Sequence, residues 1–143
     1  MNLETIRWRR TLGTLAAVTS LGAVVGSVQL VTDTFTPPVS DLSRLGLRSW
    51  VLPGIWLAAS VALPCGLVTV LAWRRSRRLG AAAVAAGLLL AVELAVQIPF
   101  VGLDPLQAVM GTVAVLLVGF GMAAHGNATG PRDRAAKYVE SPS

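Results

Sequence analysis

Residues 79–101 read LGAAAVAAGLLLAVELAVQIPFV, an apolar run interrupted by two polar side chains, Glu93 and Gln97. A helix needs about 20 apolar residues to cross the hydrocarbon core of a bilayer, so this stretch predicts a membrane-spanning helix. Glu93 and Gln97 are four residues apart and therefore share one helix face. A carboxylate in such a helix is costly unless it is protonated, paired or hydrated, which makes Glu93 the first candidate for a special role.

The same stretch carries a repeat of small residues. Ala83, Gly87, Ala91 and Ala95 follow one another at intervals of four. Small residues at this spacing let membrane helices approach closely. We therefore expect this helix to turn toward its neighbours in the protein rather than toward lipid.

The remaining apolar segments complete the fold prediction. Hydrophobic residues make up 54% of the 143 residues and charged residues only 13%, which is far from the composition of a soluble domain. Spans are expected at about 11–31, 50–73, 79–101 and 105–124, joined by short connections. The predicted fold is all-α, a membrane-embedded antiparallel four-helix bundle over residues 11–125. Residues 1–10 form a basic N-terminus, and residues 126–143, rich in Gly, Pro and charge, are expected to be a disordered tail.

Two local features of the spans carry further expectations. Gly22 and Gly26 form a GxxxG pattern in the first span, for which packing within the chain is favoured over dimerisation. Pro64 is interior to the second span and should kink it, leaving a carbonyl near Ser60 without its helical donor.

The distribution of basic residues predicts the orientation. Segments on the side of the two termini hold ten Lys and Arg, against two on the other side. The ten are Arg7, Arg9, Arg10, Arg74, Arg75, Arg77, Arg78, Arg132, Arg134 and Lys137, and the two are Arg44 and Arg48. The chain is expected in the inner (plasma) membrane. Because cytoplasmic loops of membrane proteins are enriched in basic residues, both termini are expected in the cytoplasm.

Composition also argues against several functions. The net charge of +5 is explained by arginines flanking the spans, so nucleic-acid binding is not expected. Cys65 is the only cysteine and His125 the only histidine, which excludes an intramolecular disulfide and a bis-histidine haem within one chain. No metal site, cofactor or nucleophile–base pair is predicted, and hence no enzyme. The expected partners are the lipid bilayer and another membrane protein or a second copy of the chain.

With this orientation, the polar residues of the spans gather in the outer half of the bundle. They are Glu93, Gln97, Gln29, Ser60 and Gln107. In one interpretation Glu93 is protonated, or is hydrogen-bonded to Gln97, Gln29 or Ser60, and ties helices together. In the other, Glu93 lies in a cavity and binds a cation, a proton or a polar ligand. The sequence leaves both open, with the structural role favoured.

The chain resembles a family of small uncharacterised four-span membrane proteins of bacteria, of actinobacterial type by composition. The residues that carry the resemblance, within about residues 13–122, are Gly22, Gly26, Asp33, Leu52-Pro53-Gly54, Glu93, Gln97 and Leu106-Gln107. The first loop departs from the pattern, since Thr36-Pro37-Pro38 stands where a Pro-x-Gly turn is expected. The resemblance implies a four-span fold and no known activity.

These observations favour a non-enzymatic accessory protein, which packs against another membrane protein or holds a small ligand in the polar layer. The alternative is a small homo-oligomeric transporter with Glu93 as the coupling carboxylate. Small multidrug transporters also have four spans and one membrane glutamate, but theirs lies in the first span.

Overall fold

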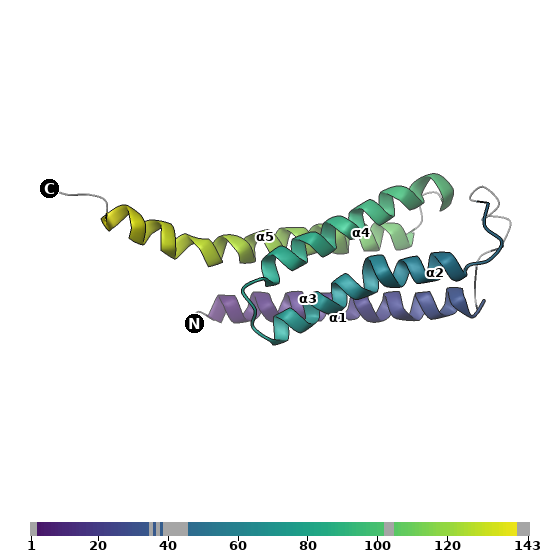
Figure 1. Ribbon diagram of the computed structural model, residues 1–143, viewed down its shortest axis with the longest axis horizontal. Coiled ribbons are helices and arrows are strands. Elements are labelled where there is room, and N and C mark those ends of the chain that lie inside the picture. Colours follow the sequence, from purple (N-terminus) through teal and green to yellow (C-terminus); the bar gives the residue numbers. More distant parts are fainter. Residues whose placement is uncertain (1–2, 35, 37, 39–45, 102–104, 140–143) are drawn as a thin grey trace.

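All regular structure in the described part of the chain is helical, and the fold is the expected all-α four-helix bundle (Figure 1). The computed structural model describes residues 3–34, 36, 38, 46–101 and 105–139. The helices are α1 (Leu3–Val31), α2 (Val51–Leu57), the π-helical turn η2 (Ala58–Ala62), α3 (Leu63–Trp73), α4 (Leu79–Val101) and α5 (Pro105–Val139). The segments α2, η2 and α3 follow one another without a break and form one rod.

Four stretches are long and apolar enough to cross a membrane. They are Ile6–Val31, Val51–Trp73, Leu79–Ile98 and Pro105–Gly126. The structure departs from the expected domain limits at both ends. Helix α1 already begins at Leu3, within the expected N-terminal segment, and α5 continues to Val139, through most of the expected disordered tail. Residues 132–139 include good helix formers such as Ala135, Ala136 and Lys137, which extend a helix already nucleated by the apolar span.

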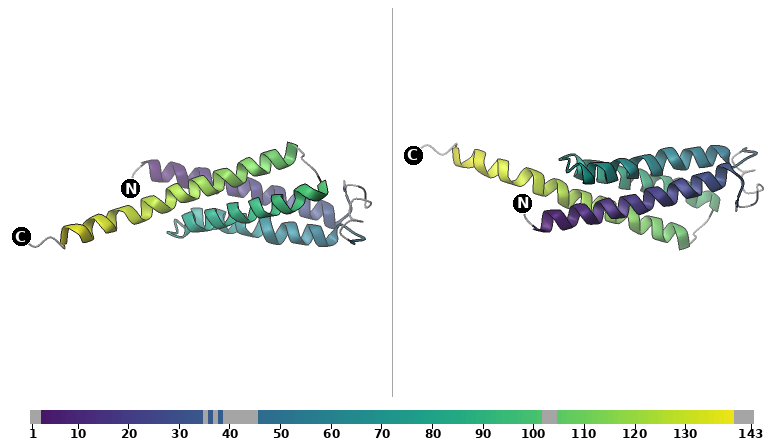
Figure 2. Two further views of the ribbon diagram at one scale, coloured as in Figure 1. Left: turned by 90° about the horizontal axis from the view of Figure 1, so that it is seen from above. Right: turned by 90° about the horizontal axis from the view of Figure 1, so that it is seen from below.

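The bundle is built from two antiparallel hairpins. In the first hairpin α1 packs along α2, η2 and α3, and in the second α4 packs along α5. The hairpins meet where α4 contacts α3 and η2, and where α5 contacts α1 (Figure 2). We call the end with the start of α1 and the 74–78 turn the basic end, and the opposite end the distal end.

Serine hydroxyls join the two rods of the first hairpin. Ser27 Oγ donates to the carbonyl of Gly54 at 2.6 Å, and Ser20 Oγ donates to the carbonyl of Ala62 at 2.9 Å. Ala62 ends η2, two residues before Pro64, whose ring nitrogen cannot donate to the carbonyl of Ser60. The expected disturbance of the helix by Pro64 thus takes the form of a π turn, and a hydroxyl from α1 satisfies a carbonyl at its end.

Glycines hold the second hairpin together. A Cβ added at Gly121 would lie 2.9 Å from the carbonyl oxygen of Gly80 and from the backbone nitrogen of Val84. A Cβ at Gly87 would lie 2.9 Å from the carbonyl oxygen of Ala114. Helices α4 and α5 therefore approach at backbone distance, which only glycine permits at these positions.

The prediction that the small residues of α4 face the neighbouring helices is correct for two of the four. Ala83 is fully buried and Gly87 is buried, whereas Ala91 and Ala95 are exposed. Each step of four residues rotates the face by about 40°, so a stripe with this spacing turns away from a nearly straight neighbour. The buried positions instead continue through Leu90 to Glu93.

The two glycines of the GxxxG pattern in α1 have different surroundings. A Cβ added at Gly26 would meet Leu57 of the same chain at 3.4 Å, whereas one added at Gly22 would meet nothing within 4 Å. Packing within the chain therefore accounts for Gly26 and not for Gly22.

Candidate functional site

Glu93 lies on the inward face of α4. Its side chain is 9% exposed, although it lies roughly 12 Å from the distal end of the helix by the rise per residue. The carboxylate therefore does not face the surface that lipid would cover. Leu90, one turn earlier, is 3% exposed, so the burial of Glu93 continues the packed face of the helix.

Both carboxylate oxygens of Glu93 accept hydrogen bonds from the chain. Gln97 Nε2 donates to Oε1 at 3.1 Å, and Trp56 Nε1 donates to Oε2 at 2.6 Å. The first bond is the contact expected from the spacing of four. The second joins α4 to α2, and thereby the second hairpin to the first.

Trp56 is the residue that the sequence analysis missed. Its ring is 59% exposed, so the indole lies on the outside of the bundle while its N–H points to the buried carboxylate. A signal was available in the sequence. An indole inside a span needs a hydrogen-bond acceptor, and the rise per residue places Trp56 roughly 8 Å from the distal end of its helix, between the depths of Gln97 and Glu93.

The other expected members of the polar layer do not reach the carboxylate. Ser60 is buried, but its Oγ donates to the carbonyl of Trp56 at 2.8 Å. Ser60 thus stabilises the turn that carries the indole, and its hydroxyl donates to Trp56 rather than to Glu93. Gln29 is exposed on α1, and Gln107 is partly buried, with an Oε1 atom that receives no hydrogen bond from the described residues.

Helix rotation explains the position of Gln29. Ser27 faces Gly54 across the first hairpin, and a residue two positions further along is rotated by about 200°. Gln29 therefore points away from the bundle at nearly the same depth. Of the five predicted site residues, the structure brings together Glu93 and Gln97, with Trp56 as the third member of the cluster.

The chemistry of this cluster is that of a clasp between helices. A carboxylate that accepts two hydrogen bonds inside the protein has both oxygens engaged, and each such bond is worth on the order of 1 kcal/mol in a membrane. The described residues contain no group of three or more His, Cys, Asp or Glu side chains that could hold a metal ion.

Comparison with known proteins identifies no relative of the chain. No family model matches the chain, and no curated protein or solved structure shows significant similarity to it. The resemblance to small bacterial four-span proteins therefore stays a prediction.

Proposed function

We propose that the chain is a small multi-pass protein of a bacterial inner membrane, without enzymatic activity, which acts as an accessory protein to another membrane protein. In this proposal Glu93, Gln97 and Trp56 form a structural clasp that fixes the two hairpins. The partner is bound on the outer surface of the bundle rather than in its interior.

The observation that carries the proposal is the engagement of both Glu93 oxygens by Gln97 and Trp56. A coupling carboxylate must exchange its partners with a transported ion or proton. A carboxylate held by an indole from one hairpin and an amide from its own helix is suited to fixing their relative position. This supports the accessory role over the transporter alternative.

The outward face of α5 is the surface proposed for the partner. The apolar span of α5 is the least covered of the four, with 17% of its most apolar window buried compared with 39% in α4. Val115 and Met122 are 71% and 62% exposed on this face, and a Cβ added at Gly119 between them would meet nothing within 4 Å. A glycine between large apolar residues suits the close approach of a second helix, and methionine adapts to irregular surfaces.

The orientation is part of the proposal. The start of α1 and the turn of residues 74–78 lie at the same end of the bundle (Figure 1), so the arginines of both segments gather at this end. The positive-inside rule places this end, with both termini, in the cytoplasm.

The test is capture of the intact protein from native membranes in polymer-bounded nanodiscs, which avoid detergent. Wild type is compared with Gly119→Leu, which fills the proposed face, and with Gly22→Leu, the matched control on α1. Neither change meets another atom of the chain within 4 Å at Cβ, so both variants should fold. Quantitative mass spectrometry measures what is retained.

We expect one membrane protein at constant stoichiometry with wild type and Gly22→Leu, and its loss by about tenfold or more with Gly119→Leu, equivalent to about 1.4 kcal/mol. Equal retention by both variants would overturn the assignment of the α5 face. A differently tagged copy of this chain as the only retained protein would replace the accessory role with self-association.

A further inference from the structure

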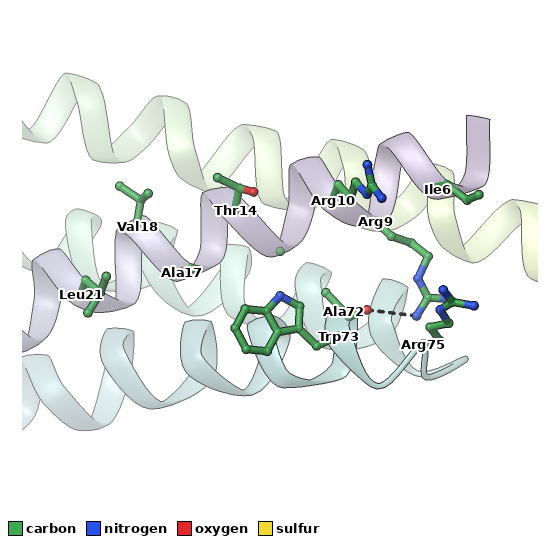
Figure 3. Close-up of a pocket in the computed structure, with 11 residues that line it drawn as sticks. Ile6, Arg9, Arg10, Thr14, Ala17, Val18, Leu21, Ala72, Trp73 and Arg75 are labelled. Carbon is green, nitrogen blue, oxygen red and sulfur yellow. Dashed lines mark hydrogen bonds between the residues drawn. The ribbon is translucent and has the colours of Figure 1, made fainter. Parts of the chain in front are cut away.

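A groove on the outside of the first hairpin has no part in the proposed function. It lies between α1 and α3 at the basic end and has a volume of about 430 Å³ (Figure 3). Its floor is formed where Gly13 meets α3, since a Cβ added at Gly13 would lie 3.0 Å from the Cβ of Ala72. The glycine therefore creates the depth of the groove.

The groove is polar at one end and apolar at the other. Arg9, Arg10 and Arg75 line the end nearest the terminus of the bundle, and Val18 and Leu21 line the opposite end (Figure 3). Trp73 lies between them and is 82% exposed. In a bilayer, tryptophan and arginine at this level mark the headgroup region, and the apolar residues beyond them face the acyl chains.

The three arginines have positive charge that the described residues do not neutralise. Arg9 donates one hydrogen bond, from Nη2 to the carbonyl of Ala72 at 3.2 Å, and Arg75 lies close enough to Arg9 for like-charge repulsion. None of the described residues that line the groove is acidic. Arg9 and Arg75 lie side by side at this end of the groove, and Arg10 lines it from the next position of α1 (Figure 3). Guanidinium groups bind phosphate through paired N–H donors.

The backbone holds Arg75 in this arrangement. Arg75 has φ of 52°, a left-handed conformation that usually falls to glycine at the end of a helix. The amide of Ser76 donates to the carbonyl of Leu71 at 3.0 Å, and that of Arg75 donates to Ala72 at 3.4 Å, which closes the end of α3. The turn directs the Arg75 side chain toward α1, into the lining of the groove. Glycine, the usual residue in this conformation, would place no positive charge there.

We propose that this groove binds one anionic phospholipid of the leaflet at the basic end, which is the cytoplasmic leaflet in the orientation proposed above. Arg9, Arg10 and Arg75 hold the phosphate, and an acyl chain lies along Val18 and Leu21. Basic pockets between membrane helices on this side are the usual sites of anionic headgroups. The apolar extension of the groove favours a lipid over a free phosphate ester, because it lies where only a chain attached to the phosphate would reach.

Lipid retention by the purified protein tests the proposal. Native mass spectrometry is applied with phosphatidylglycerol and with phosphatidylcholine of the same acyl chains. Arg10→Gln/Arg75→Gln removes two charges from the groove and leaves the Arg9 bond to Ala72. Arg77→Gln/Arg78→Gln removes the same charge from the same end outside the groove and is the matched control. Glycerol 3-phosphate is added in excess to compete with the headgroup alone.

We expect wild type to retain phosphatidylglycerol in preference to phosphatidylcholine. The groove variant should lose about tenfold or more in affinity and the control variant about twofold or less. Equal losses in the two double variants would reduce the effect to general surface charge and overturn the site. Equal retention of both lipids, or displacement by glycerol 3-phosphate, would also overturn it. Thermal unfolding of both variants confirms that they are folded, and none of these results depends on the α5 face.

Discussion

The two hairpins of the bundle both contain close glycine contacts but differ in the hydrogen bonds that accompany them. In the first, a Cβ added at Gly54 would lie 3.0 Å from the carbonyl oxygen of Ser27, and serine hydroxyls of α1 also donate to the backbone carbonyls of Gly54 and Ala62. In the second, α4 and α5 approach until the carbonyl of Gly80 lies at contact distance from Gly121. A hydrogen bond from a hydroxyl joins two helices at one point, whereas a close glycine contact requires the surrounding surfaces of both helices to be complementary.

The difference predicts unequal sensitivity to substitution. When a hydroxyl is removed, the carbonyl that accepted its hydrogen bond can accept one from another donor, including one in its own helix. The loss of stability is therefore confined to that one bond. A side chain placed between two touching backbones forces the helices apart and loses packing on both sides. The clasp of Glu93 and Trp56, which joins the hairpins to each other, should fall between these extremes.

The largest effect is expected for Gly121→Leu. Its Cβ would lie 2.9 Å from the backbone of both Gly80 and Val84, so α4 and α5 must separate. We expect a loss of about 3 kcal/mol in the free energy of unfolding, measured by titration of the protein in mixed micelles with sodium dodecyl sulfate. Gly119→Leu, two residues away in open space, is the control and should change the stability by about 0.5 kcal/mol or less. Equal stability of the two variants would contradict the close contact.

An intermediate effect is expected for Glu93→Ala. It leaves the indole N–H of Trp56 and the amide of Gln97 without their acceptor, at a cost of about 1–2 kcal/mol in the same titration. Glu93→Gln keeps one acceptor oxygen and should lose about half as much. A double-mutant cycle with Trp56→Phe should give a coupling energy of about 0.6–1.5 kcal/mol.

The same variant separates the clasp from a transport role. Glu93→Gln would abolish proton-coupled flux in proteoliposomes if Glu93 were a coupling carboxylate, whatever its effect on stability. A coupling energy near zero, together with such a loss of flux, would reverse the assignment proposed for Glu93.

The smallest effect is expected for Ser27→Ala. The loss of its 2.6 Å hydrogen bond to Gly54 should cost about 0.6 kcal/mol, the average for such bonds between membrane helices. The matched control is Thr112→Ala, whose hydroxyl bonds to Ala108 within its own helix and joins no second element. A Ser27→Ala loss as large as that of Gly121→Leu would remove the distinction between the hairpins.

The sequence predicts the helices better than their mutual orientation. The length and polarity of each run specify a span, and a spacing of four places Glu93 beside Gln97. Distance along a span also gives the depth of Gln29 and Ser60. The direction in which each faces depends on the rotation of one helix against another, which packing determines. For this reason the sequence does not reveal that Trp56 reaches Glu93 or that Gln29 lies on the exposed side of α1.

The glycines illustrate the same limit. Gly22, Gly119 and Gly121 look alike in the sequence, yet only Gly121 lies against a neighbouring helix. Composition indicates that close packing occurs, and the contact surfaces decide where it occurs.

The only cysteine of the chain, Cys65, lies in the core on α3 and is 1% exposed. Maleimides dissolved in water have no path to a thiol in that position. The natural chain therefore does not react with such a label, and Cys65 does not have to be replaced before a cysteine is introduced elsewhere. A cysteine introduced at Arg77 or Arg48 would be the only reactive thiol, and intact cells would report directly which end of the molecule faces the exterior.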